Sequence, residues 1–91
     1  MIKIEIDKRV EKDLKNIPKH DIKKIFETIE KLKDNPLLGD KLKGDLSLVR
    51  RIKLNKFRIG YFFEEHILKI IIIKVGHRKD FYEKLKRIFL K

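Results

Sequence analysis

The spacing of apolar residues changes its period three times along the chain, and this limits the folds that the sequence can adopt. Ile2, Ile4 and Ile6 alternate with charged residues, which predicts a strand with one buried face. Further segments have the spacing of helix, helix, strand, strand, strand and helix, in that order: residues 8–17, 21–32, 48–54, 57–63, 67–75 and 81–89. The element order βααβββα indicates the α+β class.

We expect a small, mostly antiparallel four-stranded sheet with an N-terminal helical hairpin and a C-terminal helix. Residues 67–75 are apolar on both faces apart from two Lys, which is typical of a central strand. Residues 36–45 contain one Pro and two Gly and are predicted to form a surface loop. A chain of 91 residues can bury one thin core, so we expect a single domain over residues 1–91.

Two helical segments carry apolar stripes that are expected to face this core. The stripe of the second helix consists of five residues: Ile22, Ile25, Phe26, Ile29 and Leu32. The stripe of the last helix consists of four: Phe81, Leu85, Ile88 and Phe89. Core packing is the favoured role for the last stripe, and a groove for a partner helix is the alternative.

Positive charge is concentrated in the second half of the chain. The formal net charge is +11, and residues 1–45 hold 12 basic and 10 acidic residues against 13 and 4 in residues 46–91. Soluble surfaces usually mix both signs of charge, as the first half does. The second half therefore favours a polyanionic partner, with nucleic acid as the first choice.

Several classes of site are excluded or unsupported. The chain has no Cys, which excludes disulfides, thiolate metal sites and a thiol nucleophile. Its three His are scattered without the spacing of a metal site, so we expect neither a metal nor a cofactor. The N-terminus does not resemble a signal peptide, and the apolar run of residues 70–73 is too short to span a bilayer. We expect a cytoplasmic protein without membrane contact.

Three basic side chains are expected to share one face of the sheet. Arg51 and Lys53 have the same strand parity, and Arg58 can reach that face from the next strand. Like charges in such a cluster repel one another unless an anion neutralises them. The cluster predicts a phosphate site, or else a mixed surface in which nearby Glu side chains balance the charge.

A further constellation follows the last predicted strand. Gly76-His77-Arg78 begins it, and Tyr82 lies four residues beyond Arg78, which predicts that both side chains lie on one face of the last helix. An arginine offers a planar fork to a phosphate, and a tyrosine offers a surface on which a base can stack. This combination is typical of RNA recognition.

These segments together resemble the RelE branch of the RelE/ParE toxin superfamily. The resemblance is carried by residues 42–44, 51–54, 57–61 and 75–82, and the element order matches as well. RelE-like toxins are ribosome-dependent endonucleases that cut messenger RNA and are held inactive by a cognate antitoxin. The resemblance thus implies three partners: the ribosome, messenger RNA and an antitoxin that we expect to be acidic.

The resemblance also implies roles for individual residues. Five residues are expected to be catalytic: Arg51, Lys53, Arg58, Arg78 and Tyr82. The RNA 2′-hydroxyl would attack the adjacent phosphate without a metal, with Lys53 or Tyr82 as general base. Arg51 stands where some relatives have a second Lys, and because a guanidinium keeps its proton it can bind phosphate but not act as base. Four other residues are expected to contact RNA: Arg50, Lys56, His77 and Lys79.

Two other functions are compatible with the basic second half. One is a ParE-like toxin that binds a topoisomerase without cutting RNA, and the other is a non-catalytic RNA-binding module. The pair Arg78 and Tyr82 favours the nuclease, whereas the charge alone fits all three functions.

Overall fold

The computed structural model describes residues 1–89, in which three α-helices cover a five-stranded sheet. The strands are β1 (Lys3–Ile6), β2 (Asp40–Lys41), β3 (Arg50–Leu54), β4 (Phe57–Glu64) and β5 (Lys69–His77). The helices are α1 (Lys8–Leu14), α2 (Lys19–Lys31) and α3 (Phe81–Phe89), and two short 3₁₀ turns are η1 (Gly44–Leu46) and η2 (Glu65–Ile67). The α+β class predicted from the sequence is confirmed.

The sheet has the strand order β1-β5-β4-β3-β2. Only the pair β1–β5 is parallel within the described residues, so the sheet is mostly antiparallel as predicted. The predicted number of four strands is wrong, because Asp40 and Lys41 pair with Arg51 and Arg50 as an additional edge strand. Two residues are too few to show a period-two pattern, and for this reason the segment reads as a loop in the sequence.

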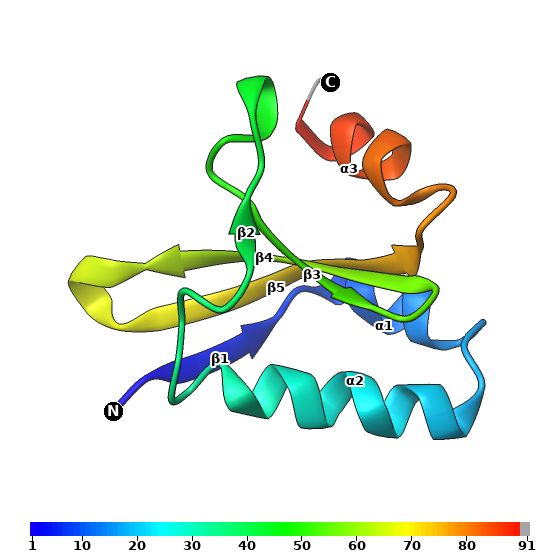
Figure 1. Ribbon diagram of the computed structural model, residues 1–91, viewed down its shortest axis with the longest axis horizontal. Helices are drawn as coiled ribbons and strands as arrows, with labels where there is room; N and C mark the ends of the chain where they lie inside the picture. The colour runs from blue at the N-terminus through cyan, green and yellow to red at the C-terminus, as the bar shows by residue number, and fades with distance from the viewer. Residues whose placement is uncertain (90–91) are drawn as a thin grey trace.

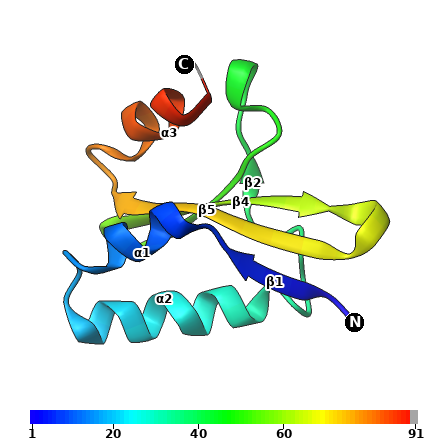
Figure 2. The same cartoon turned by 180° about the vertical axis from the view of Figure 1, so that it is seen from behind.

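Apolar side chains pack against both faces of the sheet. On one face, Val10 of α1 and Ile25 of α2 share a core with the buried side chains of β3, β4 and β5. On the other face, α3 buries Phe81 and Leu85 against a smaller cluster. Figures 1 and 2 show this arrangement, with α1 and α2 on one side of the sheet and α3 on the other.

The stripe of α3 serves as core, as the sequence favoured. Phe81 and Leu85 are completely buried, Ile88 packs beside them, and Phe89 lies at the rim with its ring 5.6 Å from that of Phe62. Gly60 makes this close packing possible, since a Cβ atom there would lie 2.9 Å from Cζ of Phe81. The last helix is therefore fitted to its own sheet.

The stripe predicted for α2 is wrong at one position. Phe26 is 40% exposed, whereas Thr28 is buried and its hydroxyl donates to the Lys24 carbonyl at 2.9 Å. A helix turns by about 100° per residue, so Thr28 lies about 50° and Phe26 about 110° from the midpoint of the buried Ile25 and Leu32.

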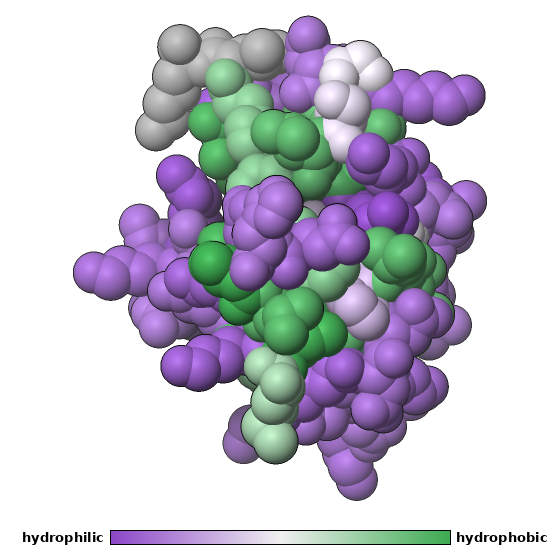
Figure 3. All heavy atoms as spheres, turned by 90° about the vertical axis from the view of Figure 1, so that its left-hand side faces the viewer, coloured by the Kyte–Doolittle hydropathy of each residue, from purple (hydrophilic) through white to green (hydrophobic). Residues whose placement is uncertain are grey.

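Apolar side chains also reach the surface near the end of the sheet where β4 leads into β5. Leu37, Leu48 and Phe63 line a shallow cavity of about 200 Å³ together with Lys41 and Arg50. Figure 3 views this side of the molecule and shows apolar surface bordered by charged side chains. No helix within residues 1–89 is long and apolar enough to cross a membrane.

Candidate active site

The three basic residues predicted to share a face do so. Lys53 of β3 lies directly opposite Arg58 of β4, and Arg51 lies opposite Gly60 in the next pair on the same face. This is the face that α3 covers, because Gly60 faces Phe81. Lys53 is exposed, and Arg51 and Arg58 are partly buried. We call Arg51, Lys53 and Arg58 the cationic cluster.

Arg51 is held by hydrogen bonds from two directions. Its Nη1 donates to the Tyr82 hydroxyl at 2.9 Å, and its Nη2 donates to Oδ2 of Asp40 at 3.1 Å. The Arg51 side chain is only 15% exposed, whereas that of Asp40 is 83% exposed. The Arg51 Nε is buried without an acceptor in the described part of the chain. A guanidinium fixed in this way presents a preformed site for an anion.

Arg58 is anchored at the turn between β3 and β4. Its Nη1 donates to the carbonyls of Asn55 and Phe57, at 2.9 and 2.8 Å. Asn55 has a φ of 54°, the left-handed conformation that a two-residue hairpin turn requires and that Asn tolerates. The turn therefore fixes the second arginine of the cationic cluster.

The predicted relation between Arg78 and Tyr82 is wrong in its geometry. The helix α3 begins only at Phe81, so Arg78 precedes it in a turn and the two residues do not share a helical face. The Arg78 backbone N–H donates to the Lys56 carbonyl at 2.8 Å, which places Arg78 beside the β3–β4 turn. Tyr82 meets Arg51 instead. The Tyr82 hydroxyl thus contacts the cationic cluster at Arg51, and the Arg78 backbone lies beside the turn that anchors Arg58.

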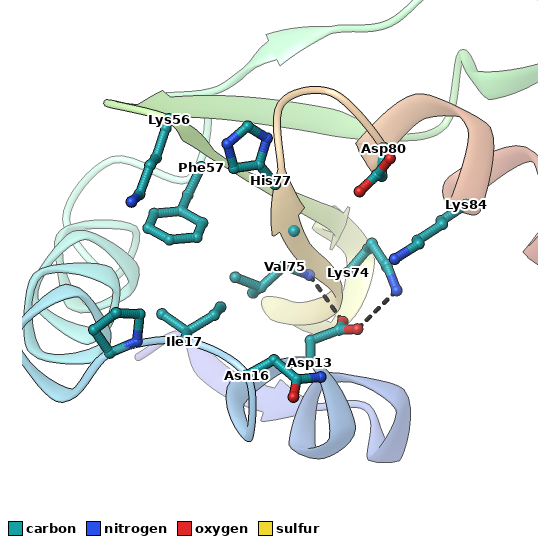
Figure 4. Close-up of a pocket in the computed structure, with 12 residues that line it drawn as sticks. Asp13, Asn16, Ile17, Lys56, Phe57, Lys74, Val75, His77, Asp80 and Lys84 are labelled. Carbon is teal, nitrogen blue, oxygen red and sulfur yellow. Dashed lines mark hydrogen bonds and ion pairs between the residues drawn. The ribbon is translucent and has the colours of Figure 1, made fainter.

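Two of the predicted RNA contacts, Lys56 and His77, line a cavity of about 440 Å³. The His77 ring lies edge-on to that of Phe57 with centroids 6.3 Å apart, and Lys56 Nζ is 5.6 Å from the Phe57 centroid. In Figure 4 these three side chains lie across the cavity from Asp13, which accepts hydrogen bonds from Lys74 Nζ at 2.7 Å and from the Val75 N–H at 3.2 Å.

The other two predicted RNA contacts differ in position. Lys79 is exposed in the turn before α3, and its backbone N–H donates to Nδ1 of His77 at 3.2 Å. Arg50 follows the opposite strand parity from Arg51 and therefore points to the other face of the sheet. Its Nη1 donates to the Gly39 carbonyl at 2.9 Å. Arg50 thus holds the segment that leads into β2.

A buried tyrosine, Tyr61 of β4, fixes the same segment. The Tyr61 hydroxyl accepts the Gly39 N–H at 2.9 Å and donates to the Pro36 carbonyl at 2.7 Å. Burial raises the pKa of Tyr61 above its ordinary value, against smaller lowering effects of the Gly39 N–H and Arg50. A Cβ atom on Gly39 would lie 2.8 Å from Cε1 of Tyr61, so only glycine fits this contact.

Asp40 is the site residue that sequence reasoning missed. It pairs with Arg51 as a β2–β3 partner, and nothing in its neighbourhood in the sequence signals that role. Within residues 1–89, no group of three or more His, Asp or Glu side chains could hold a metal ion. The chemistry available at the site is that of fixed cations, one carboxylate and one phenol.

The chain is a small α+β domain with basic side chains fixed on one face of its sheet. A family model described as "ParE-like toxin of type II bacterial toxin-antitoxin system" matches residues 4–86. A protein of Methanocaldococcus jannaschii named "Putative toxin RelE1" is 41% identical over 87 residues, which cover 88% of this chain and 93% of that protein. The chain belongs to the RelE/ParE toxin superfamily and is RelE-like.

Solved structures agree with this assignment. A chain of the RelB-RelE antitoxin-toxin complex from Methanococcus jannaschii is 32% identical with a TM-score of 0.69, covering 88% of this chain and 96% of that one. A chain of the RelBE2 toxin-antitoxin complex from Mycobacterium tuberculosis has a TM-score of 0.78 at 20% identity, covering 85% and 98%. At 20% identity, the similarity to the Mycobacterium tuberculosis chain shows a shared fold and no more.

Proposed function

We propose that this toxin is a ribosome-dependent endoribonuclease that cleaves messenger RNA by attack of a 2′-hydroxyl, without a metal. The observation that carries the proposal is the register of β3 and β4, which puts Lys53 opposite Arg58 on the face where Arg51 meets Tyr82. An amine, two guanidinium groups and a phenol then surround one surface site. These groups suit a phosphodiester that gains charge as it reacts.

The reaction requires a base that removes the proton of the 2′-hydroxyl. It also requires cations that stabilise the negative charge developing on the phosphate oxygens and on the departing 5′-oxygen. Lys53, as the neutral amine, takes the proton of the 2′-hydroxyl, whose oxygen then attacks the adjacent phosphorus. The bond from phosphorus to the 5′-oxygen breaks, which leaves a 2′,3′-cyclic phosphate and a 5′-hydroxyl. Arg51 and Arg58 bind the non-bridging oxygens, and each well-placed donor contributes about 3 kcal/mol to stabilising the transition state.

Arg78 and Tyr82 complete the proposed site. Arg78, in the turn next to the β3–β4 hairpin, neutralises the charge on the departing 5′-oxygen while water supplies its proton. The Tyr82 hydroxyl already accepts a hydrogen bond from Arg51, so we assign it the positioning of that guanidinium and its ring the stacking of a base. Lys56, His77 and Lys79 extend the RNA contact, whereas Arg50 serves the fold.

Dependence on the ribosome follows from what the site lacks. The cationic cluster contains no His, the side chain whose ordinary pKa lies near 7, so it is a weak acid–base catalyst by itself. Holding a messenger with its 2′-oxygen in line with the leaving group supplies the missing orientation, which is worth several kcal/mol. The ribosome is the proposed source of that alignment.

A cognate antitoxin is the second proposed partner. The basic second half of the chain favours an acidic antitoxin, whose association weakens as salt rises. Binding that proved insensitive to salt would indicate that apolar contacts dominate recognition. The toxin would then bind its antitoxin through surfaces other than the cationic face.

The test is cleavage of ribosome-bound messenger by purified protein. Lys53→Ala and Arg58→Ala should each lower the cleavage rate by at least about tenfold, whereas Lys23→Ala, a change of an exposed lysine on α2, should leave it unchanged. The 5′ products should carry a cyclic or 3′-phosphate, and EDTA should be tolerated once ribosome integrity is controlled. Undiminished cleavage in both cluster variants would remove this face from the mechanism.

Measurements of growth, DNA supercoiling and RNA binding, made beside the cleavage assay, separate the two alternative functions. Inhibition of growth with intact messenger and disturbed DNA supercoiling would identify a topoisomerase-directed toxin. Binding to RNA without cleavage on the ribosome would identify a binding module. For the nuclease, Arg78→Ala should abolish cleavage yet keep ribosome binding within about tenfold, because many other basic residues hold the phosphates.

A further inference from the structure

The free protein already holds a carboxylate at one of its proposed phosphate-binding groups. Nη2 of Arg51 donates to Oδ2 of Asp40 at 3.1 Å, while Nη1 is engaged by Tyr82. Carboxylate and phosphate oxygens bind a guanidinium through the same donors. Asp40 therefore occupies a position that a phosphate oxygen can take.

The position of Asp40 is set by the fold and not by the ion pair alone. Asp40 and Arg51 are partners in the β2–β3 register. Gly39, the residue before Asp40, is held by hydrogen bonds at both of its backbone polar groups. Its N–H donates to the Tyr61 hydroxyl at 2.9 Å, and its carbonyl accepts from Arg50 Nη1 at 2.9 Å. Gly39 is buried, so these bonds are shielded from water. The backbone thus brings the Asp40 carboxylate to Arg51.

The carboxylate itself is easily displaced. The Asp40 side chain is 83% exposed, against 15% for Arg51. Its release returns a carboxylate to water at little cost, because ion pairs with an exposed member are weak. The guanidinium, in contrast, stays in place through its bond to Tyr82 and its burial.

We propose that Asp40 is an internal competitor for the RNA phosphate at Arg51, which an incoming phosphodiester displaces. This inference rests on the proposed function for the identity of the ligand as RNA, but the competition itself is a property of the free protein. A single phosphate must displace a carboxylate that the fold keeps at high local concentration. An RNA that also contacts Lys53 and Arg58 overcomes this competition more readily, so Asp40 selects against isolated anions.

Two binding measurements test the competition. One uses a short single-stranded RNA with 2′-O-methyl groups, which cannot be cleaved, and follows fluorescence anisotropy at low salt. The other titrates inorganic phosphate and follows the Nε–H resonance of Arg51 by NMR. Asp40→Asn should bind both probes about 2- to 5-fold more tightly, the range set by the weakness of exposed ion pairs.

A matched control separates displacement from a general change of charge. Asp45→Asn removes the same charge from an exposed position in η1, and it should tighten binding by less than about 1.5-fold. In an Arg51→Ala background, Asp40→Asn should have no effect beyond that of Asp45→Asn. Thermal melts of each variant establish that it is folded.

The outcomes distinguish this inference from the proposed function. Equal effects of Asp40→Asn and Asp45→Asn would refute the competition even if the protein cuts messenger RNA. Weaker binding by Asp40→Asn would also refute it, since Asp40 would then be orienting Arg51 for the ligand. Tighter phosphate binding at Arg51 in a protein that fails to cleave messenger would support the competition and overturn the nuclease.

Discussion

The hydroxyl of Tyr61 should be a main determinant of stability, because it anchors the segment that carries Asp40. Replacement of Tyr61 by Phe keeps the buried ring but removes the acceptor for the Gly39 N–H and the donor to the Pro36 carbonyl. Gly39 is buried, so its N–H loses its partner without gaining water, at a cost of about 1–3 kcal/mol. Pro36 is partly exposed, and its carbonyl can recover a water molecule.

We therefore expect Tyr61→Phe to lower the free energy of unfolding by about 2 kcal/mol. For a domain of this size, that corresponds to a thermal midpoint about 10 °C lower. Urea unfolding followed by circular dichroism measures the first quantity and a thermal melt the second. Because Asp40 follows Gly39, the variant should also bind RNA in the direction expected for Asp40→Asn.

The second tyrosine of the chain provides a matched control. Tyr82→Phe removes a hydroxyl whose one hydrogen-bond partner among residues 1–89 is Arg51, in a partly exposed position, so it should cost less than about 1 kcal/mol. Cleavage should respond in the opposite order. Tyr82→Phe should lower the cleavage rate more than Tyr61→Phe does, because it removes the hydroxyl that positions Arg51. Equal unfolding free energies for the two variants would show that the Tyr61 hydroxyl does not anchor the segment.

Three further predictions concern packing, an ion pair and alkaline pH. Gly60→Ala should lower the free energy of unfolding by about 1–3 kcal/mol in urea, because its Cβ would lie 2.9 Å from Phe81 Cζ. Asp13→Asn should cost about 1–2 kcal/mol in the same assay, since Lys74 Nζ loses a carboxylate at 2.7 Å in a pair that is 15% or less exposed; an unchanged midpoint would show that water replaces the carboxylate. Burial raises the pKa of Tyr61 in the folded protein, so the stability that the neutral hydroxyl contributes is complete below the ordinary pKa of about 10. That stability is lost as the pH rises toward the pKa of Tyr61 in the folded protein. Unfolding measured above about pH 10 should thus show a steeper loss of stability in the wild type than in Tyr61→Phe, and parallel curves would contradict this origin.

Local spacing was sufficient to predict most of the fold. The helices and the four longer strands follow from apolar periodicity, which depends only on near neighbours in the chain. The shared face of Arg51, Lys53 and Arg58 follows in the same way, because strand parity and a two-residue turn fix which side chains lie across from one another. The cationic face could therefore be predicted from the sequence.

Contacts between distant residues decided the rest of the site. The sequence placed Tyr82 with Arg78 by helical spacing, but α3 begins at Phe81, and packing of that helix over Gly60 brings the phenol to Arg51, 31 residues away in the chain. Arg51 also meets Asp40, in a strand of two residues that local periodicity cannot reveal. Periodicity reports which side of an element is buried, whereas the partner that a polar side chain meets depends on how the separate elements pack together.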